Sequence, residues 1–153
     1  MLTTISSPEK AAAAREAGAD HTIDYKREDV GERVMDLTGK HGVDAVIEMD
    51  LAANAKLIPF VLRPKGSVIV YGTGAATANL PAYFCLTQSI RVQFFLVYEL
   101  DSREREHAVK AINRALEQGK VLNRIGPTSA LADIAAAHEA VERGTIGNVI
   151  VTM

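Results

Sequence analysis

Two serines and a lysine near the start of the chain have the side chains needed to bind a phosphate. The apolar segment Leu2–Ile5 is followed by Ser6 and Ser7, and Lys10 comes one helical turn later. An NAD-specific site places an acidic residue here for the ribose 2′-hydroxyl, whereas hydroxyls and a lysine at a helix N-terminus suit the 2′-phosphate of NADP. The pattern favours NADP, although an ordinary helix cap at Ser7 and a solvated Lys10 fit the same spacing.

The segment Gly72-Thr73-Gly74 is a second candidate, because it directly follows the apolar run Ser67–Tyr71. The dinucleotide fingerprint G-x-G-x-x-G would have a third glycine where this chain has Thr77, and it would follow the first strand of the fold rather than a late one. The segment is therefore not that fingerprint. It is either a turn that ends a buried strand or a point of contact with a cofactor.

The carboxylates and the single cysteine form no recognisable catalytic set. Asp20, Asp24, Glu48 and Asp50 flank apolar segments, but their spacing does not bring two of them to one site. We expect neighbours at a strand end to hold Glu48. Cys85 is the only cysteine, which excludes an intrachain disulfide and a cysteine-cluster zinc site, and no metal is expected.

His138 is predicted to have a structural role. It falls in phase with Leu131, Ile134 and Val141 on one helical stripe, which indicates a partly buried histidine rather than a catalytic one. No catalytic acid or base is assigned.

Composition and charge narrow the possible partners. The 153 residues are 48% hydrophobic, enough for one domain with a real core, and the net charge is -2. Basic residues are scattered, so neither nucleic acid nor an anionic membrane is an expected partner. Neither a signal peptide nor a run of about 20 apolar residues is present, and a cytoplasmic, reducing compartment is the expectation.

Short apolar strands alternate with amphipathic helices along most of the chain. Strands are expected at 2–5, 21–25, 43–49, 67–71 and 91–98, with a weak strand or loop at 122–131 and a closing strand at 147–153. Helices are expected at 8–17, 28–37, 51–62, 82–87, 102–117 and 132–142. Continuous Val/Ile strands between helices predict an α/β fold with a doubly wound parallel sheet. A boundary near residue 120 divides the chain into 1–120 and 121–153.

A succession of short strings resembles the zeta-crystallin branch of NADPH:quinone oxidoreductases, in the medium-chain dehydrogenase/reductase superfamily. The strings keep the family's order and spacing over essentially the whole chain: Ser6–Lys10, Glu16–Asp20, Ile23–Tyr25, Gly42–Val46, Leu62–Ser67, Ala136–Ala140 and Gly147–Val151.

The resemblance implies a partial Rossmann-like NADP-binding domain at 1–120, and a segment at 121–153 that returns to the family's GroES-like catalytic domain. The family's catalytic domain, first strand and glycine-rich pyrophosphate loop would precede Met1, so the fold is expected to be incomplete at its N-terminus. The implied activity is reduction of quinones or related carbonyl or enone acceptors by direct hydride transfer from NADPH, without zinc.

The resemblance also implies positions for the cofactor. Its adenosine phosphate contacts fall on Ser6, Ser7 and Lys10, and the aromatic residue near the phosphate falls on Tyr25. Contacts further along the cofactor fall on Met49 and its neighbours, Gly72, Thr73, Gly74, Phe95, Leu96 and Val97, and from the terminal segment on Arg143 or Asn148.

The family pairs two subunits through its last parallel strand, here 91–98, which implies a homodimer. Phe94, Phe95 and Val97 make that edge apolar, and an uncovered apolar edge invites association. Two alternatives stay open: a non-catalytic, stand-alone nucleotide-binding or structural module, and an unrelated doubly wound domain such as a methyltransferase core.

Overall fold

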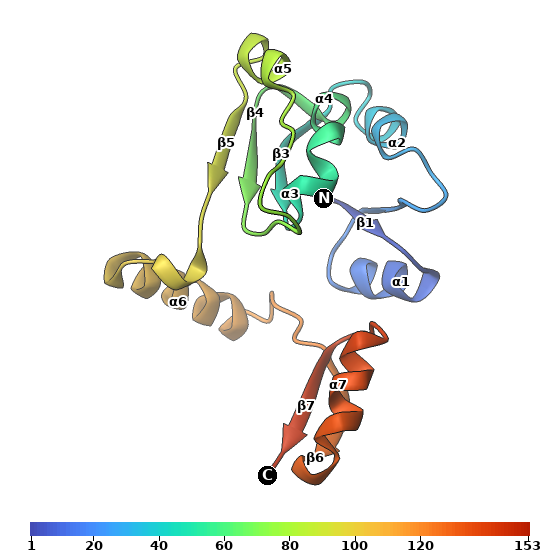
Figure 1. The fold of residues 1–153 in the computed structure, drawn as a ribbon, viewed down its shortest axis with the longest axis vertical. Helices are drawn as coiled ribbons and strands as arrows, with labels where there is room; N and C mark the ends of the chain where they lie inside the picture. The colour runs from blue at the N-terminus through green and yellow to red at the C-terminus, as the bar shows by residue number, and fades with distance from the viewer.

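A computed structural model describes residues 1–153 and shows an α/β chain in which all strand pairs are parallel (Figure 1). The strands are β1 (Leu2–Ile5), β2 (His21–Asp24), β3 (Val43–Glu48), β4 (Leu62–Val70), β5 (Arg91–Phe94), β6 (Ile125–Ala130) and β7 (Asn148–Thr152). The α-helices are α1 (Pro8–Glu16), α2 (Val30–Leu37), α3 (Leu51–Asn54), α4 (Ile58–Val61), α5 (Ala82–Thr87), α6 (Ser102–Glu117) and α7 (Ile134–Glu142). Short 3₁₀ helices are η1 (Ala55–Leu57), η2 (Val97–Glu99) and η3 (Leu131–Asp133).

The strands form three separate groups rather than one continuous sheet. β1 pairs with β2, β4 lies between β3 and β5, and β6 pairs with β7. The expected doubly wound, Rossmann-like arrangement is confirmed. The sheet is incomplete, as expected, because its strands do not all pair with one another. β1 and β3 each pair on one side only, so the sheet is interrupted between them.

One hydrophobic core spans the first two groups of strands. Val68 and Val70 of β4 are 0% and 3% exposed, and they cluster with Ile23 of β2, Leu51 of α3 and Ile58 of α4. Each such side chain contributes about 1.5–3 kcal/mol when it leaves water. The core therefore holds β1–β2 and β3–β5 together although no ladder of hydrogen bonds joins them.

Caps and a proline explain where the helices differ from expectation. α2 begins at Val30 rather than residue 28, because the Asp29 carboxylate accepts a hydrogen bond from the Glu32 amide at 2.8 Å and acts as the N-cap. The helix expected over 51–62 is divided into α3, η1 and α4. Pro59 has no amide hydrogen to donate to Ala55, so a regular helix cannot run through this point.

The bounds of β4 and β5 differ most from the strands that the sequence predicts. β4 begins at Leu62 rather than residue 67, because residues 63–66 lie inside a register shift between the Val43–Leu62 and Ala45–Ser67 pairs. β5 ends at Phe94, so the strand expected over 91–98 is too long. The Phe95 amide donates to Val70 at 3.0 Å, and β4 ends there, so no neighbouring strand remains to pair with the following residues.

The C-terminal part forms its own unit of β6, α7 and β7, drawn in red in Figure 1 below the other strands. Ala137 and Ala140 are its buried residues, whereas His138 is exposed, so the prediction of a partly buried histidine was wrong. The stripe used for that prediction is itself exposed, with Val141 at 60%. An ion pair between Arg124 and Glu16 links this unit to α1. None of the helices combines the length and the apolar character that a membrane span requires.

Candidate functional site

The predicted phosphate-binding residues lie together where β1 and β2 end. The Tyr25 amide donates to the Ile5 carbonyl at 3.2 Å, which places Tyr25 next to Ser6 and Ser7. Ser7 is the N-cap of α1, and its hydroxyl oxygen accepts from the Lys10 amide at 3.3 Å. Because this bond uses a lone pair, the Ser7 hydroxyl can still donate its hydrogen, and the Glu9 carboxylate competes with any bound anion for it.

Glu9 places a carboxylate in the same first turn of α1 as Lys10. Its own backbone amide and the Ser7 hydroxyl hold the pKa of the Glu9 carboxyl below its usual range. The N-terminus of α1 therefore already holds one negative charge at neutral pH. Any phosphate bound by Ser7 and Lys10 would lie near that carboxylate.

A network of carboxylates links the ends of β3 and β4. Glu48 is 8% exposed, and its Oε1 atom accepts from the Asp50 amide at 2.6 Å and from Asn54 Nδ2 at 3.0 Å. This confirms that neighbours at the strand end hold Glu48. Asp50 Oδ1 in turn accepts from the Gly74 amide at 2.8 Å and from the Ala53 amide at 3.3 Å. Asp50 thus caps α3 and fastens the turn that follows β4.

Contacts with Met49 and Asp50 explain both glycines of the Gly72-Thr73-Gly74 turn. A Cβ atom on Gly72 would collide with the Met49 carbonyl, and one on Gly74 would lie 2.9 Å from Asp50 Oδ2. Packing between the two loops is thus sufficient reason for glycine at both positions. These contacts support the interpretation of this segment as a turn that ends a buried strand. Contact between its backbone and a cofactor stays a prediction.

An apolar hollow of about 310 Å³ opens beside this turn. Its lining combines the ends of β4 and β5: Val70, Tyr71, Gly72, Thr73, Phe94, Phe95 and Leu96. The rings of Tyr71 and Phe95 lie 6.3 Å apart between centroids and are tilted by 35°. Of the predicted residues in this region, the hollow is lined by Gly72, Thr73, Phe95 and Leu96, but not by Met49, Gly74 or Val97. Tyr71 and Phe94 were missed, although their place at the carboxyl ends of parallel strands was a usable signal.

The two predicted residues of the terminal segment lie in the β6–α7–β7 unit. Arg143 Nη1 is 3.4 Å from Glu139 Oε2 on the preceding turn of α7. Asn148 Nδ2 donates to Asn123 Oδ1 at 3.2 Å. Both side chains therefore contact residues of the C-terminal part of the chain, and the structure brings neither of them to the hollow.

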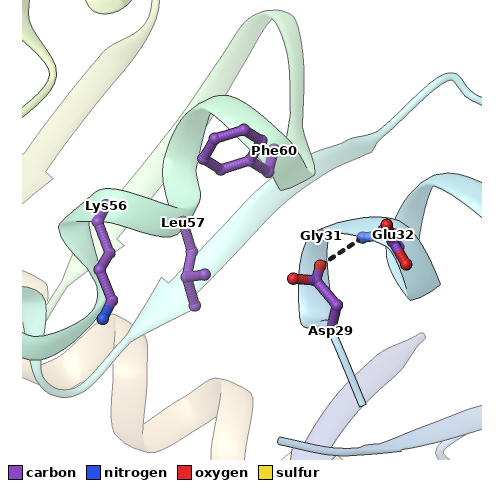
Figure 2. Close-up of a pocket in the computed structure, with 6 residues that line it drawn as sticks. All are labelled: Asp29, Gly31, Glu32, Lys56, Leu57 and Phe60. Atoms are coloured by element: carbon purple, nitrogen blue, oxygen red, sulfur yellow. Dashed lines mark hydrogen bonds between the residues drawn. The ribbon is translucent and has the colours of Figure 1, made fainter.

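A second hollow of about 360 Å³ lies between α2 and the η1–α4 segment (Figure 2). Figure 2 shows its six lining residues: Asp29, Gly31, Glu32, Lys56, Leu57 and Phe60. The Asp29 carboxylate is occupied as the cap of α2, and a Cβ atom on Gly31 would lie only 2.7 Å from the Phe60 Cβ atom. We interpret this hollow as a groove where two helices pack closely. No group of three or more His, Cys, Asp or Glu side chains is placed to hold a metal ion.

Comparison with protein families shows which family this chain belongs to. Residues 2–114 match the family described as zinc-binding dehydrogenase. The chain belongs to the zinc-binding dehydrogenase family. The match confirms the resemblance to the medium-chain dehydrogenases and excludes the unrelated methyltransferase-like alternative.

Curated relatives of the chain are named as a reductase and as quinone oxidoreductases. The chain is 29% identical to a 2-haloacrylate reductase of Burkholderia sp, over 98% of this chain and 47% of the relative. It is 28% identical to a quinone oxidoreductase of Pseudomonas aeruginosa, over 98% of this chain and 48% of the relative. The chain therefore spans about half the length of the curated relatives it matches.

Solved structures show the same fold. A crystal structure of 2-haloacrylate reductase superposes with a TM-score of 0.84 and 27% identity, over 99% of this chain and 49% of that one. A quinone oxidoreductase of Pseudomonas syringae pv. Tomato DC3000 superposes with a TM-score of 0.83 and 26% identity, over 99% of this chain and 48% of that one. The Rossmann-like placement of the elements is therefore shared with complete reductases.

Proposed function

We propose that this chain provides most of the NADP-binding domain of a reductase that transfers a hydride from NADPH to a quinone or to a related carbonyl or enone acceptor. The observation that carries the proposal is the grouping of Ser6, Ser7, Lys10 and Tyr25 at the carboxyl ends of β1 and β2. The relatives support the reductase class, since they are named quinone oxidoreductase and 2-haloacrylate reductase.

The residues present fit the adenosine end of NADPH. Ser6 and Ser7 supply hydroxyl donors and Lys10 supplies an exposed positive charge for the 2′-phosphate, while Tyr25, at 54% exposed, offers a ring beside them. No acidic residue occupies the end of β1, where an NAD-specific site would have one. NADPH would supply the hydride when bound, and the proposal includes no zinc ion.

The apolar hollow fits the other end of the cofactor. Tyr71, Phe94 and Phe95 provide apolar and aromatic surface that excludes water, and the Asp50–Gly74 bond holds the adjoining turn in place. These residues would position the reacting groups rather than exchange protons with them, so no catalytic acid or base is assigned. Met49, Leu96 and Val97 remain proposed contacts, as do Arg143 and Asn148 from the terminal unit.

The experiment is calorimetric titration of the purified chain with 2′,5′-ADP and, separately, with 5′-AMP. We expect tighter binding of 2′,5′-ADP, and we expect Lys10→Ala to weaken it about 3- to 10-fold at low salt without changing 5′-AMP binding. Lys56→Ala is the matched control, because Lys56 is an exposed lysine in the other hollow. Equal affinity for the two nucleotides would contradict the NADP assignment.

A non-catalytic nucleotide-binding module is the second candidate, and the unpaired edges of β1 and β3 favour it. Measuring NADPH oxidation by the chain with 1,4-benzoquinone separates the two candidates. Binding of 2′,5′-ADP without turnover would support the module. Turnover that Lys10→Ala slows at limiting NADPH would support the reductase.

The remaining proposals concern organisation. We propose residues 1–120 as the nucleotide-binding part and 121–153 as the segment that joins a GroES-like catalytic domain, with a cytoplasmic location. We also propose a homodimer formed through the free edge of β5, now limited to Arg91–Phe94.

A further inference from the structure

The groove between α2 and the η1–α4 segment exposes apolar surface at its centre. Phe60 of α4 is 60% exposed, although α4 packs directly against α2. Gly31 of α2 is buried at this contact, and a Cβ atom on it would lie 2.7 Å from the Phe60 Cβ atom. The close packing therefore holds the base of the Phe60 side chain, while its ring is left to solvent beside the half-buried Leu57.

Charges of opposite sign flank this apolar centre. Figure 2 shows Lys56 on one side of Leu57 and Phe60, with Asp29 and Glu32 on the other side. One oxygen of the Asp29 carboxylate is occupied as the cap of α2. The exposed side chains of Lys56 and Glu32 form no ion pair within the chain, because the ion pairs that α2 forms involve other residues. Both charges are therefore free to bond outside the chain.

A surface arranged in this order is complementary to a second copy of itself. A two-fold axis through the apolar centre would place the basic side of each copy opposite the acidic side of the other. Each Lys56 would then face the partner's Glu32. The two Phe60 rings would meet at the axis, and aromatic side chains at the centre of an interface contribute most to binding.

We propose that this groove is a contact between two copies of the chain, in which the Phe60 rings are buried and Lys56 bonds to the partner's Glu32. A stable interface uses about 20–30 residues on each side, so the six residues of the groove predict weak pairing that appears only at high protein concentration. None of these residues belongs to β5, so the contact can coexist with the homodimer proposed at that edge. It is also independent of nucleotide binding.

The first test follows amide NMR signals of the isotope-labelled chain while unlabelled chain is added. We expect the signals of Gly31, Glu32, Lys56 and Phe60 to shift together as the concentration rises, because these residues border the contact. Signals of the β6–α7–β7 unit should stay constant. Groove signals that do not move up to about 1 mM would overturn the proposal.

Charge reversal tests the two-fold arrangement. Lys56→Glu and Glu32→Lys each place like charges opposite one another, so each variant should pair with itself at least about fivefold more weakly than the parent. A mixture of the two variants has opposite charges at both ion pairs and should pair again. The measurement titrates labelled Lys56→Glu first with the same unlabelled variant and then with unlabelled Glu32→Lys.

Lys120→Glu is the matched control, because Lys120 is an exposed lysine outside the groove, and it should pair as the parent does. Recovery in the mixture supports the contact and shows that neither variant is misfolded. If each variant alone pairs as strongly as the parent, or if the mixture pairs no better than its components, the two-fold contact is wrong.

Removing the aromatic ring tests the apolar centre. We expect Phe60→Ser to weaken pairing by at least about tenfold, because the buried ring is lost. Tyr83→Ser on α5 is the matched control, since Tyr83 is 82% exposed outside the groove, and it should pair normally. Unchanged amide signals away from the groove show that each variant is folded. Equal pairing of Phe60→Ser and the parent would place the contact elsewhere.

Discussion

The N-terminus of α1 holds a carboxylate and a proposed phosphate site within the same helical turn. The lowered pKa of Glu9 shows that the helix amide and the Ser7 hydroxyl already stabilise an anion there. We expect Glu9→Gln to tighten binding of 2′,5′-ADP severalfold, because it removes a like charge beside the 2′-phosphate and keeps the side-chain length. Titration at low salt measures the change. Glu32→Gln on α2 is the control, and unchanged affinity in Glu9→Gln would place the phosphate elsewhere.

Asp50 connects three backbone segments through one carboxylate. It accepts from Gly74 and Ala53, while its own amide donates to the buried Glu48. We expect Asp50→Ala to lower the free energy of unfolding by about 1–2 kcal/mol, because the Gly74 amide and the first turn of α3 lose their acceptor. Urea denaturation measures the loss. Asp50→Asn keeps one acceptor oxygen and should recover most of it, and equal losses in both variants would show that charge matters more than the bond.

At the scale of elements, an ion pair fastens the start of β3 to β4. Arg63 Nε lies 2.5 Å from Asp44 Oδ1, and the Arg63 guanidinium lowers the pKa of the Asp44 carboxyl. A carboxyl with a lower pKa in the folded state stabilises the fold above its unfolded pKa and loses this contribution as pH falls through the folded value. We therefore expect Asp44→Asn to be less stable than the parent at pH 7, and we expect the difference to disappear once the pH falls below the lowered pKa of Asp44 in the folded state.

Thermal unfolding of both proteins from pH 2 to pH 7 measures this difference. The effect should be small and should shrink with added salt, because Asp44 is 80% exposed. Asp133→Asn is a suitable control, since Asp133 is an exposed carboxylate of η3 with no ion pair. A constant difference across the whole pH range would rule out the ion pair as its cause.

Local chemical signals explain which elements could be predicted from the sequence. The helix expected at about 102–117 agrees with α6, and its ends carry clear local signals, because Asp101 and Glu104 form a capping box and Gly119 follows the last turn. The bounds of β5 were not predicted, because an apolar run continues past Phe94 and only the end of β4 stops the pairing. Likewise, the apolar run at 51–62 predicts one helix if Pro59 is ignored. Pro59 has no amide hydrogen for the Ala55 carbonyl, and the run is divided into shorter helices.

Residues of the candidate site that directly follow one strand could be predicted from the sequence. Residues whose place depends on contacts between strands could not. Ser6, Ser7 and Tyr25 follow strands directly, so their grouping could be expected from the parallel order alone. The roles of Asp50 and Tyr71 depend on how the ends of β3, β4 and β5 meet. Charge repulsion from Glu9 also requires knowing where its side chain lies.

At the scale of the molecule, large apolar side chains are exposed on β3, on α6 and at the free edge of β5, where the homodimer is proposed. Ile47 borders the interrupted sheet, and Val109, Ile112 and Leu116 form an exposed stripe along α6. Phe94 at 61% exposed continues this pattern at the outer edge of β5. Surface of this kind on a free domain favours association with a partner.

The proposed homodimer gives the last prediction. Phe95 faces β4 through its amide, so Val92 and Phe94 direct their backbone groups to the free edge of β5. Two copies paired there would form one continuous sheet, and Phe94 would leave water. We expect Phe94→Lys to shift the sedimentation of the chain from dimer to monomer, because a charge on an edge strand opposes edge-to-edge pairing.

Leu86→Lys on α5 is the matched control, since Leu86 is 79% exposed and does not belong to β5, and it should leave the dimer intact. Thermal unfolding in the same buffer shows whether each variant is folded before its mass is interpreted. If the parent chain sediments as a monomer at all concentrations, the edge of β5 does not pair two copies. If both variants dissociate, the contact surface is broader than this strand and includes the helix beside it.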